Sequence, residues 1–217
     1  MYILWDWNGT LLDDTQAALD TLNIMLRRRG APEIEMGFYR DNFAFPVKPF
    51  YSSIGMVLEN EDWDKLAEEY HDLYAAQPKK LNSQALEALT MVRDAGARQA
   101  IISALRQDLL DEATGRYGVA GFMEHIYGVD NLDGCSKLDR ARLLLAEIRR
   151  ESDAEIVLIG DSLHDFEVAG EMGVRCVLCS QGSHAHWRLA GAAPTGETLV
   201  EAARMALWRR NADGIVV

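Results

Sequence analysis

The sequence predicts an α/β fold: a doubly wound parallel sheet with an inserted α-helical domain. Three observations support it. Apolar runs with the length of buried strands occur at residues 2–6, 99–103, 125–129, 156–160 and 174–179. Helical patterning separates the later runs, as expected for parallel βαβ units. The stretch 15–80, by contrast, has helical patterning and no strong strand, so we expect it to be an insertion after the first strand.

The elements of the sheet domain follow from local patterns. The first strand, residues 2–6, ends at the polar residue Asp6 and is followed by a turn that contains Gly9. Gly96 follows the helical segment 89–95 and predicts a helix stop before the second strand. Residues 138–150 predict an amphipathic helix. Its apolar stripe consists of Leu138, Ala141, Leu144, Leu145 and Ile148.

The inserted segment contains two amphipathic helical stretches, at residues 15–29 and 63–76. The first closes with three arginines, 27–29, which suit the negative end of the helix dipole and which we expect to be solvated. Asp13 and Asp14 immediately precede this helix. Aspartate is favoured at helix N-termini, so we expect both residues to cap it.

The length of 217 residues exceeds the usual size of a single domain and allows a proper core. One core domain with a smaller inserted domain is the organisation that this length favours. We assign residues 1–14 and 81–217 to the core domain. We assign residues 15–80 to the helical insertion.

The charge balance restricts the partners. The chain has 34 acidic and 22 basic residues, a net charge of -12, and no stripe rich in lysine or arginine. Nucleic acid is therefore a poor partner, because binding to its backbone requires clustered cations. No apolar run approaches the ~20 residues that span a bilayer, and no charged segment precedes the apolar start. We expect a cytoplasmic protein, monomeric or homodimeric, that binds a small anion and no membrane.

The cysteines and two of the histidines do not indicate a metal site. Cys176 and Cys179 lie within the strand predicted at residues 174–179, and residues three apart on a strand face opposite ways. This favours core packing over metal binding or redox chemistry for the pair. His184 and His186 lie in a polar segment rich in glycine and serine, where we expect exposed loop residues.

Polar residues recur where the predicted strands end. Asp6 follows the first strand and Asp161 follows the strand 156–160, with Asp165 four residues later. The crossover and switch-point rules bring these strand ends to one edge of the sheet. Three further groups belong at this edge: the turn of Asn8, Gly9 and Thr10, the strand-end residue Ser103, and Lys137. Either Asp6 or Asp161 alone could be a helix cap, but together with Lys137 they indicate a functional site.

This order of aspartate, serine, lysine and a GDxxxD pair resembles the haloacid dehalogenase superfamily of aspartate-nucleophile phosphohydrolases. The helical insertion after the first turn resembles the cap of its phosphoglycolate phosphatase and β-phosphoglucomutase branch. The resemblance covers nearly the whole chain. It implies a Rossmann-like core with a helical cap, and Mg²⁺-dependent hydrolysis of a small phosphorylated metabolite.

The resemblance also implies roles for the residues. Asp6 would attack phosphorus and form an aspartyl phosphate. Asp6, Asp161 and the backbone carbonyl of Asn8 would hold Mg²⁺.

Phosphate oxygens would be bound by the turn and by two side chains. The amide groups around Gly9 and Thr10 would form an anion nest, and the Ser103 hydroxyl and Lys137 ammonium would hold the remaining oxygens. Asp165 would orient Lys137 or a metal-bound water from behind. His164, inside the same motif, is expected to point outward from a loop.

Position 8 departs from the family. Phosphatases of this family carry a second aspartate there, which protonates the leaving oxygen, work that typically accounts for about 10²–10⁴-fold in rate. The amide of Asn8 cannot titrate. Three hypotheses remain open.

The first hypothesis, which we favour, is a phosphohydrolase that is slow or acts on good leaving groups such as acyl phosphates or anhydrides. The second is a relative of phosphonoacetaldehyde hydrolase, which would cleave a C–P bond through a Schiff base on Lys48. The third is a non-catalytic module that binds metal and phosphate.

Overall fold

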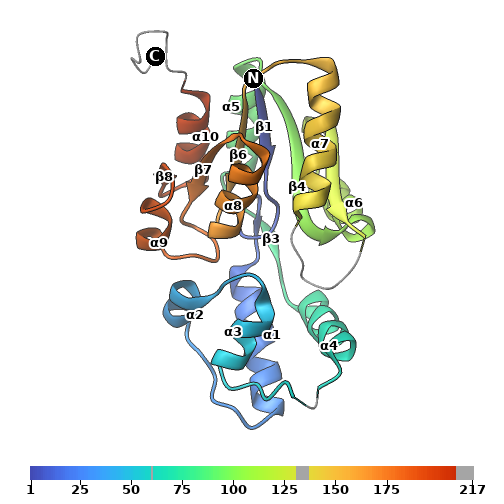
Figure 1. The fold of residues 1–217 in the computed structure, drawn as a ribbon, viewed down its shortest axis with the longest axis vertical. Helices are drawn as coiled ribbons and strands as arrows, with labels where there is room; N and C mark the ends of the chain where they lie inside the picture. Colours follow the sequence, from blue (N-terminus) through green and yellow to red (C-terminus); the bar gives the residue numbers. More distant parts are fainter. Residues whose placement is uncertain (60, 131–136, 209–217) are drawn as a thin grey trace.

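A six-stranded parallel sheet forms the core of the protein (Figure 1). The computed structural model describes residues 1–59, 61–130 and 137–208. The strands are β1 (Tyr2–Trp5), β4 (Arg98–Arg106), β5 (His125–Val129), β6 (Ile156–Gly160), β7 (Arg175–Cys179) and β8 (Thr195–Gly196). Their order is β5-β4-β1-β6-β7-β8. This confirms the predicted doubly wound parallel sheet, with β1 between β4 and β6.

Helices cover both faces of the sheet, because the strand side chains alternate between two apolar clusters. Ile3 and Trp5 belong to one cluster, which α5 (Ala85–Asp94) and α10 (Leu199–Leu207) complete. Tyr2 and Leu4 belong to the other, against α7 (Leu138–Glu151) and α8 (Leu163–Met172). Three short elements complete the core: α6 (Gln107–Arg116), the 3₁₀ helix η1 (Ala120–Phe122) and α9 (His186–Ala190).

The strands lie close to the predicted runs, with two differences. β4 continues past residue 103 to Arg106, and its pairing with β5 shifts between Ile102 and Arg106. β8 has two residues and was not predicted, since so short a strand leaves no periodic pattern. The two cysteines of β7 lie on opposite faces as expected, with Cys179 in one apolar cluster and Cys176 against the other. Cys135 lies outside the described residues.

Four helices form a second unit below the carboxyl ends of the strands in Figure 1. We call this unit the cap. Its helices are α1 (Thr15–Arg28), α2 (Met36–Asn42), α3 (Val47–Ser53) and α4 (Trp63–Ala76). They share a separate apolar cluster that is rich in aromatic residues. The chain passes between core and cap through two short antiparallel strands, β2 (Leu12–Asp13) and β3 (Lys80–Leu81).

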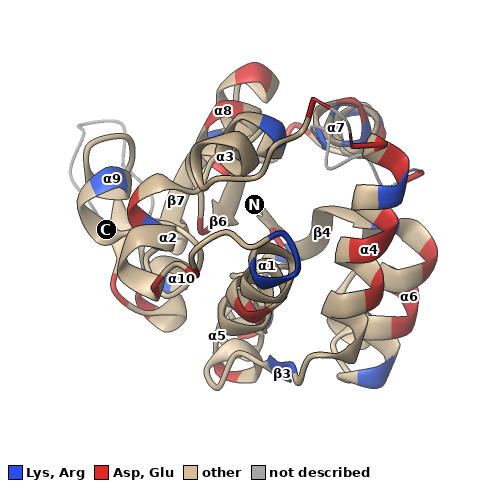
Figure 2. Ribbon diagram, turned by 90° about the horizontal axis from the view of Figure 1, so that it is seen from below, with Lys and Arg blue, Asp and Glu red and all other residues tan. Residues whose placement is uncertain are grey.

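The three arginines at the end of α1 lie at the cap end remote from the sheet (Figures 1 and 2). Arg27 and Arg28 are exposed, as expected. Arg29 is largely covered, because it forms ion pairs of 2.9 and 2.8 Å with Glu61 and Glu69. Within the ranges that the structure describes, no helix is long and apolar enough to cross a membrane.

Candidate active site

Side chains from four segments meet at the carboxyl edge of the sheet. Asp6 directly follows β1 and Asp161 directly follows β6. Because β1 pairs with β6 on one side and β4 on the other, these carboxylates lie beside Ser103 of β4. Lys137 stands at the N-cap position of α7 and extends into the same space. Four residues far apart in sequence thus line one cavity.

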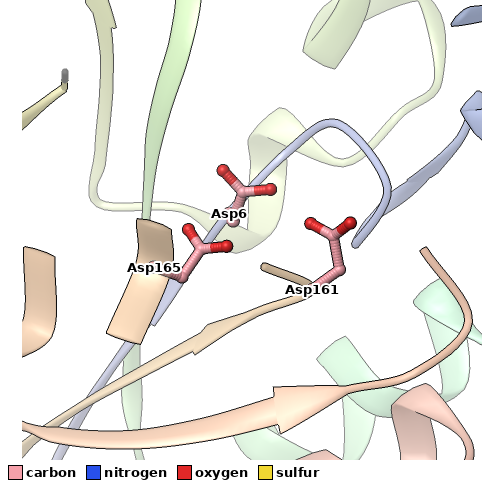
Figure 3. Close-up of side chains that lie close together, drawn as sticks. All are labelled: Asp6, Asp161 and Asp165. Atoms are coloured by element: carbon pink, nitrogen blue, oxygen red, sulfur yellow. The ribbon is translucent and has the colours of Figure 1, made fainter. Parts of the chain in front are cut away.

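Three buried carboxylates form the centre of this site (Figure 3). Oxygen atoms of Asp6, Asp161 and Asp165 lie within 4.8 Å of one another. The Thr10 hydroxyl lies 3.2 Å from Oδ2 of Asp6 and 3.3 Å from Oδ1 of Asp161, so it bridges the two. Oδ2 of Asp161 also accepts hydrogen bonds from the backbone N–H of Ser183, at 2.6 Å, and from its hydroxyl.

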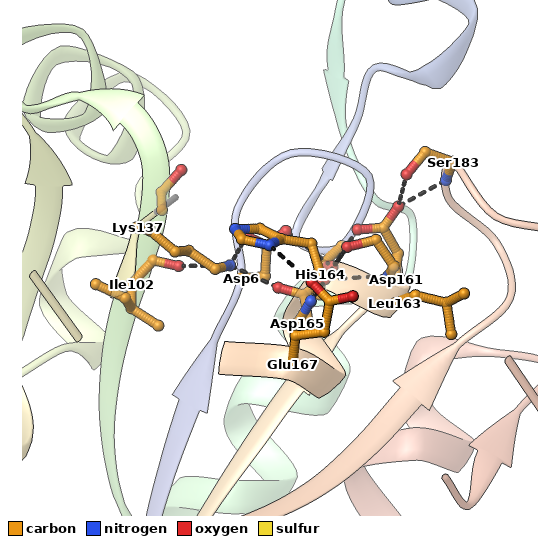
Figure 4. Close-up of polar contacts among 12 residues, drawn as sticks. Asp6, Ile102, Lys137, Asp161, Leu163, His164, Asp165, Glu167 and Ser183 are labelled. Atoms are coloured by element: carbon orange, nitrogen blue, oxygen red, sulfur yellow. Dashed lines mark hydrogen bonds and ion pairs between the residues drawn. The ribbon is translucent and has the colours of Figure 1, made fainter. Parts of the chain in front are cut away.

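Lys137 neutralises part of this negative charge (Figure 4). Its Nζ donates to Oδ1 of Asp6, to Oδ1 of Asp165 at 2.6 Å and to the carbonyl of Ile102 at 3.2 Å. Burial opposes the charge of Lys137, yet Asp165 and Asp6 together raise its pKa. Lys137 is therefore charged at neutral pH and holds its ammonium against Asp6.

Asp165 is held by two kinds of partner. With Ser162 it forms a capping box at the start of α8, in which Oδ2 accepts the Ser162 N–H at 3.0 Å. Its other oxygen accepts from Lys137. Burial acts to raise the pKa of Asp165, but Lys137 lowers it below its ordinary value, so the group is ionised. Both oxygens are thus engaged, and the side chain fixes the position of Lys137.

Asp6 and Asp161 fit a hard divalent cation. Burial raises the pKa of Asp161 to about 7, and the neighbouring Asp165 adds to the shift. Burial also raises the pKa of Asp6, despite the opposing effect of Lys137. Two buried carboxylates held this close repel each other when both are ionised. A divalent cation that prefers oxygen ligands relieves this repulsion and binds strongly between them.

Glycines let the backbone approach these carboxylates. Gly9 has φ +76°, and a Cβ there would lie 2.3 Å from Oδ2 of Asp161. A Cβ at Gly182 would lie 2.2 Å from the same oxygen. The turn after β1 and the loop after β7 can therefore close around Asp161 only because both positions lack a side chain.

Asn8 does not point to solvent but joins a hydrogen-bonded group with two other residues. Its Nδ2 donates to Oδ2 of Asp14 at 2.7 Å and lies 3.0 Å from the hydroxyl of Tyr74. The Tyr74 hydroxyl itself donates to Oδ2 of Asp14, and the N–H of Gly9 donates to Oδ1 at 2.7 Å. Tyr74 belongs to α4, so this group ties the cap to the turn that follows Asp6.

The prediction that Asp13 and Asp14 cap the first helix was wrong. Asp13 lies in β2. Asp14 stands at the N-cap position of α1, but its side chain makes no capping bond. It turns back towards the site instead, where Gly9, Asn8 and Tyr74 compete successfully for its oxygens. Burial raises the pKa of this carboxyl above its ordinary value, although the three donors oppose the shift.

A cavity of about 190 Å³ lies between this site and the cap. Phe45 of the cap faces His164 of the core with 5.0 Å between ring centroids. Arg40 of α2 donates two hydrogen bonds of 3.0 Å, to the carbonyls of Gln181 and Gly182. The cap is thus closed over the site and held by contacts on both sides of the cavity.

Both expectations for the histidines of the core need correction. His164 is not an outward loop residue, because it lies in the first turn of α8 and lines the cavity. His184 is 2% exposed, and its Nδ1 accepts the N–H of Leu163 at 3.0 Å. Burial lowers the pKa of His184 to about 4. His186 is exposed, as expected.

Lys48 does not occupy the position that a Schiff base would require. Its side chain is exposed, and Nζ lies 5.3 Å from the ring centroid of Trp63. Trp63 lines the cavity, whereas Lys48 does not. An imine with a bound substrate needs an amine inside the closed site, so the structure argues against the Schiff-base hypothesis.

Sequence reasoning missed three residues of the site. Asp14 and Tyr74 were not recognised because their positions fit a helix cap and an amphipathic helix equally well. Ser183 carries no local signal beyond following Gly182 after a strand. A glycine in a loop after a parallel strand, close to an edge with carboxylates, is the signal that could have indicated it.

The comparisons with known proteins agree with this geometry. The model of the family described as haloacid dehalogenase-like hydrolase matches residues 3–179. A phosphoglycolate phosphatase from Caulobacter vibrioides is 25% identical over 188 residues, which cover 83% of this chain and 79% of the relative.

Two solved structures show that the whole fold is shared. A haloacid dehalogenase-like family hydrolase from Streptococcus pneumoniae has a TM-score of 0.76 at 17% identity and covers 94% of this chain and 97% of its own. Protein Tyrosine Kinase A from Mycobacterium tuberculosis has a TM-score of 0.76 at 22% identity, with 95% and 97% covered. Their different names illustrate that the fold alone does not determine the reaction.

Proposed function

Because the chain belongs to the haloacid dehalogenase-like hydrolase family, we propose that it is a Mg²⁺-dependent phosphohydrolase of a small phosphorylated metabolite. The family match confirms the predicted resemblance and the prediction that the chain is an enzyme. The observation that carries the proposal is the cluster of Asp6, Lys137 and Asp161 beneath a closed cap.

Asp6 is the nucleophile in this proposal. One of its oxygens forms a bond to phosphorus while the bond from phosphorus to the leaving oxygen breaks. Water then cleaves the aspartyl phosphate, which releases inorganic phosphate and restores Asp6. Lys137 holds the carboxylate in position through its hydrogen bond.

The phosphoryl oxygens are neutralised by fixed groups of the chain. Lys137 contributes one positive charge, and the Ser103 hydroxyl and the N–H groups around Gly9 and Thr10 are available as donors. Asp6, Asp161 and the backbone carbonyl of Asn8 would hold Mg²⁺, which neutralises phosphate charge when bound. Asp165 keeps Lys137 in place from behind.

Asn8 restricts the leaving groups that this site can release. The amide has no proton to give, so an alkoxide would have to depart without protonation from position 8. Leaving groups that are stable as anions avoid this requirement. We infer that the enzyme selects its substrates partly by leaving-group acidity.

The test is a screen of the purified protein with Mg²⁺ against phosphate monoesters, acyl phosphates and anhydrides, with phosphate release as the readout. Turnover should disappear in Asp6→Asn and on chelation of the metal. Asp153→Asn, which changes an exposed aspartate in the loop before β6, is the matched control and should keep full activity. Turnover that persists in Asp6→Asn would contradict the proposal, and phosphate binding without any turnover would favour the non-catalytic module.

A further inference from the structure

The cap side of the cavity is built mostly from aromatic and aliphatic side chains, with Thr15 and His71 as its polar members. The aromatic residues that line it from the cap are Tyr39, Phe43, Phe45, Tyr51, Trp63, Tyr70 and Tyr74. Leu22, Val47 and two alanines fill the spaces between them. A wall of this kind binds a flat apolar group through burial and ring contacts.

The described part of this wall carries no lysine or arginine. Among the described residues that line the cavity, Lys137 is the one lysine or arginine, and it is already engaged by Asp6 and Asp165. The three arginines at residues 27–29 lie at the far end of α1 (Figure 2). Arg40 of α2 donates to two backbone carbonyls of the core, and neither Arg40 nor Lys48 lines the cavity. A carboxylate or a second phosphate on the substrate would be buried here without a lysine or arginine partner, which is unfavourable.

Three tyrosine hydroxyls in the wall have no hydrogen-bond partner among the described residues: those of Tyr39, Tyr51 and Tyr70. Tyr39 and Tyr51 are buried and Tyr70 is half-buried, and burial raises the pKa of all three hydroxyls. The hydroxyls are therefore neutral, and buried tyrosine hydroxyls usually find a partner. An uncharged polar substituent on the bound group would provide one.

The size of the cavity sets a limit. A cavity of about 150 Å³ is enough for benzene, and this one measures about 190 Å³. Its space is shared by the transferred phosphoryl group next to Asp6. This volume therefore favours a substrate with a single ring.

The leaving-group restriction at Asn8 points to the same class. A phenol ionises near pKa 10, as tyrosine does, several units below an alkyl alcohol. An aryloxide can therefore depart with the electron pair of the P–O bond and take its proton from water afterwards. The reaction forms the Asp6–phosphorus bond, breaks the aryl oxygen–phosphorus bond and needs no acid at position 8.

We propose that the substrate is a phosphate ester of an uncharged aromatic alcohol with one ring, whose ring lies between the cap aromatics. This inference rests on the proposed phosphohydrolase function and names its substrate class. Acyl phosphates and anhydrides also have good leaving groups, but anhydrides release a charged phosphate that finds no lysine or arginine in this wall. Sugar and polyol phosphates release alkoxides, which Asn8 cannot protonate.

Four compounds separate these possibilities: phenyl phosphate, benzyl phosphate, phosphoglycolate and acetyl phosphate. Benzyl phosphate keeps the ring but releases an alkoxide, so its kcat/KM should fall below that of phenyl phosphate by on the order of 10²-fold, mainly through kcat. Phosphoglycolate should be about 10²-fold poorer as well, because its carboxylate meets the apolar wall. Acetyl phosphate has a good leaving group but no ring, so its KM should be higher than that of phenyl phosphate.

Variants of the wall test the ring contact. Trp63→Ala should raise KM for phenyl phosphate roughly tenfold and leave inhibition by inorganic phosphate unchanged. Trp208→Ala, an exposed tryptophan outside the cavity, is the matched control and should change neither value.

Three outcomes would count against the inference in different ways. Phosphoglycolate or acetyl phosphate turned over as efficiently as phenyl phosphate would refute the aryl class and leave the phosphohydrolase proposal standing. An equal rise of the inhibition constant for inorganic phosphate in Trp63→Ala would show a general loss of structure and remove the support from the ring contact. Hydrolysis of none of the four compounds by folded, Mg²⁺-loaded protein would refute the aryl class, and the phosphohydrolase proposal would fall as well only if the broader screen described above also gave no turnover.

Discussion

Replacing Asn8 by aspartate would put two carboxylates side by side. The Nδ2 atom of Asn8 lies 2.7 Å from Oδ2 of Asp14, so a carboxylate oxygen in its place would start at the same distance. With an effective dielectric constant of about 20, two charges so close repel by about 6 kcal/mol, or roughly four pKa units. The pair would share one proton at neutral pH, as close carboxylate pairs do. Asn8→Asp thus introduces a proton donor beside the leaving group.

The expected result is a selective gain in activity. Hydrolysis of benzyl phosphate, whose alkoxide needs a proton, should rise about tenfold or more through general acid catalysis. Phenyl phosphate should gain much less, because its leaving group is stable without a proton. Mg²⁺ affinity should stay nearly unchanged, since the backbone carbonyl of residue 8 is retained. Steady-state kinetics with both esters and a Mg²⁺ titration measure these effects.

The same change has a structural cost. The amide that donates to Asp14 and faces the Tyr74 hydroxyl is lost, which should destabilise the protein by about 1–3 kcal/mol. Asn8→Ala, which also loses the amide but adds no acid, is the control. A well-folded Asn8→Asp protein with unchanged Mg²⁺ affinity and no gain on benzyl phosphate would refute the reasoning. So would an equal gain in Asn8→Ala.

Other consequences of the site can be tested separately. Burial raises the pKa of Asp161 to about 7, and Mg²⁺ must displace that proton; calorimetry should therefore show affinity rising from pH 6 to pH 8, and a flat profile would contradict this. Gly9→Ala should lower both the melting temperature and Mg²⁺ affinity, because its Cβ would meet Asp161; Gly30→Ala, with a similar φ and nothing within 4 Å, should cost less, and equal losses would rule out the clash. Lys137→Met should leave Asp6 and Asp165 unpaired and destabilise the protein by about 3–5 kcal/mol in urea unfolding, whereas unchanged stability would show that the pair is not held as described.

The part of the molecule that follows from local pattern was predictable. The strand ends that carry Asp6 and Asp161 were located because buried parallel strands are short apolar runs, and the rules of chain connection then bring their carboxyl ends to one edge. The same rules assigned Lys137 to this edge, and it does lie against Asp6 there. The amphipathic stripe of α7 was predicted from its spacing alone.

What could not be predicted depends on contacts between distant segments. An aspartate before a helix predicts a cap, and only the closed cap supplies the Tyr74 hydroxyl that competes for the side chain of Asp14. His184 has polar neighbours in sequence, yet Phe43 of the cap and Leu163 of the core surround it. Composition cannot reveal burial that another domain provides.

Asn8 and Asp14 are best understood as one unit rather than as two separate features. Asp14 accepts from the Gly9 N–H, the Tyr74 hydroxyl and the Asn8 amide, so position 8 must provide a donor. An aspartate there would be an acceptor next to an acceptor unless it kept a proton. The amide at position 8 therefore stabilises the link between the cap and the turn that carries Asp6, and the loss of an acid is the chemical consequence. Full recovery of an ordinary acid at position 8 should then require a change at Asp14 as well, because only that change removes the competing carboxylate.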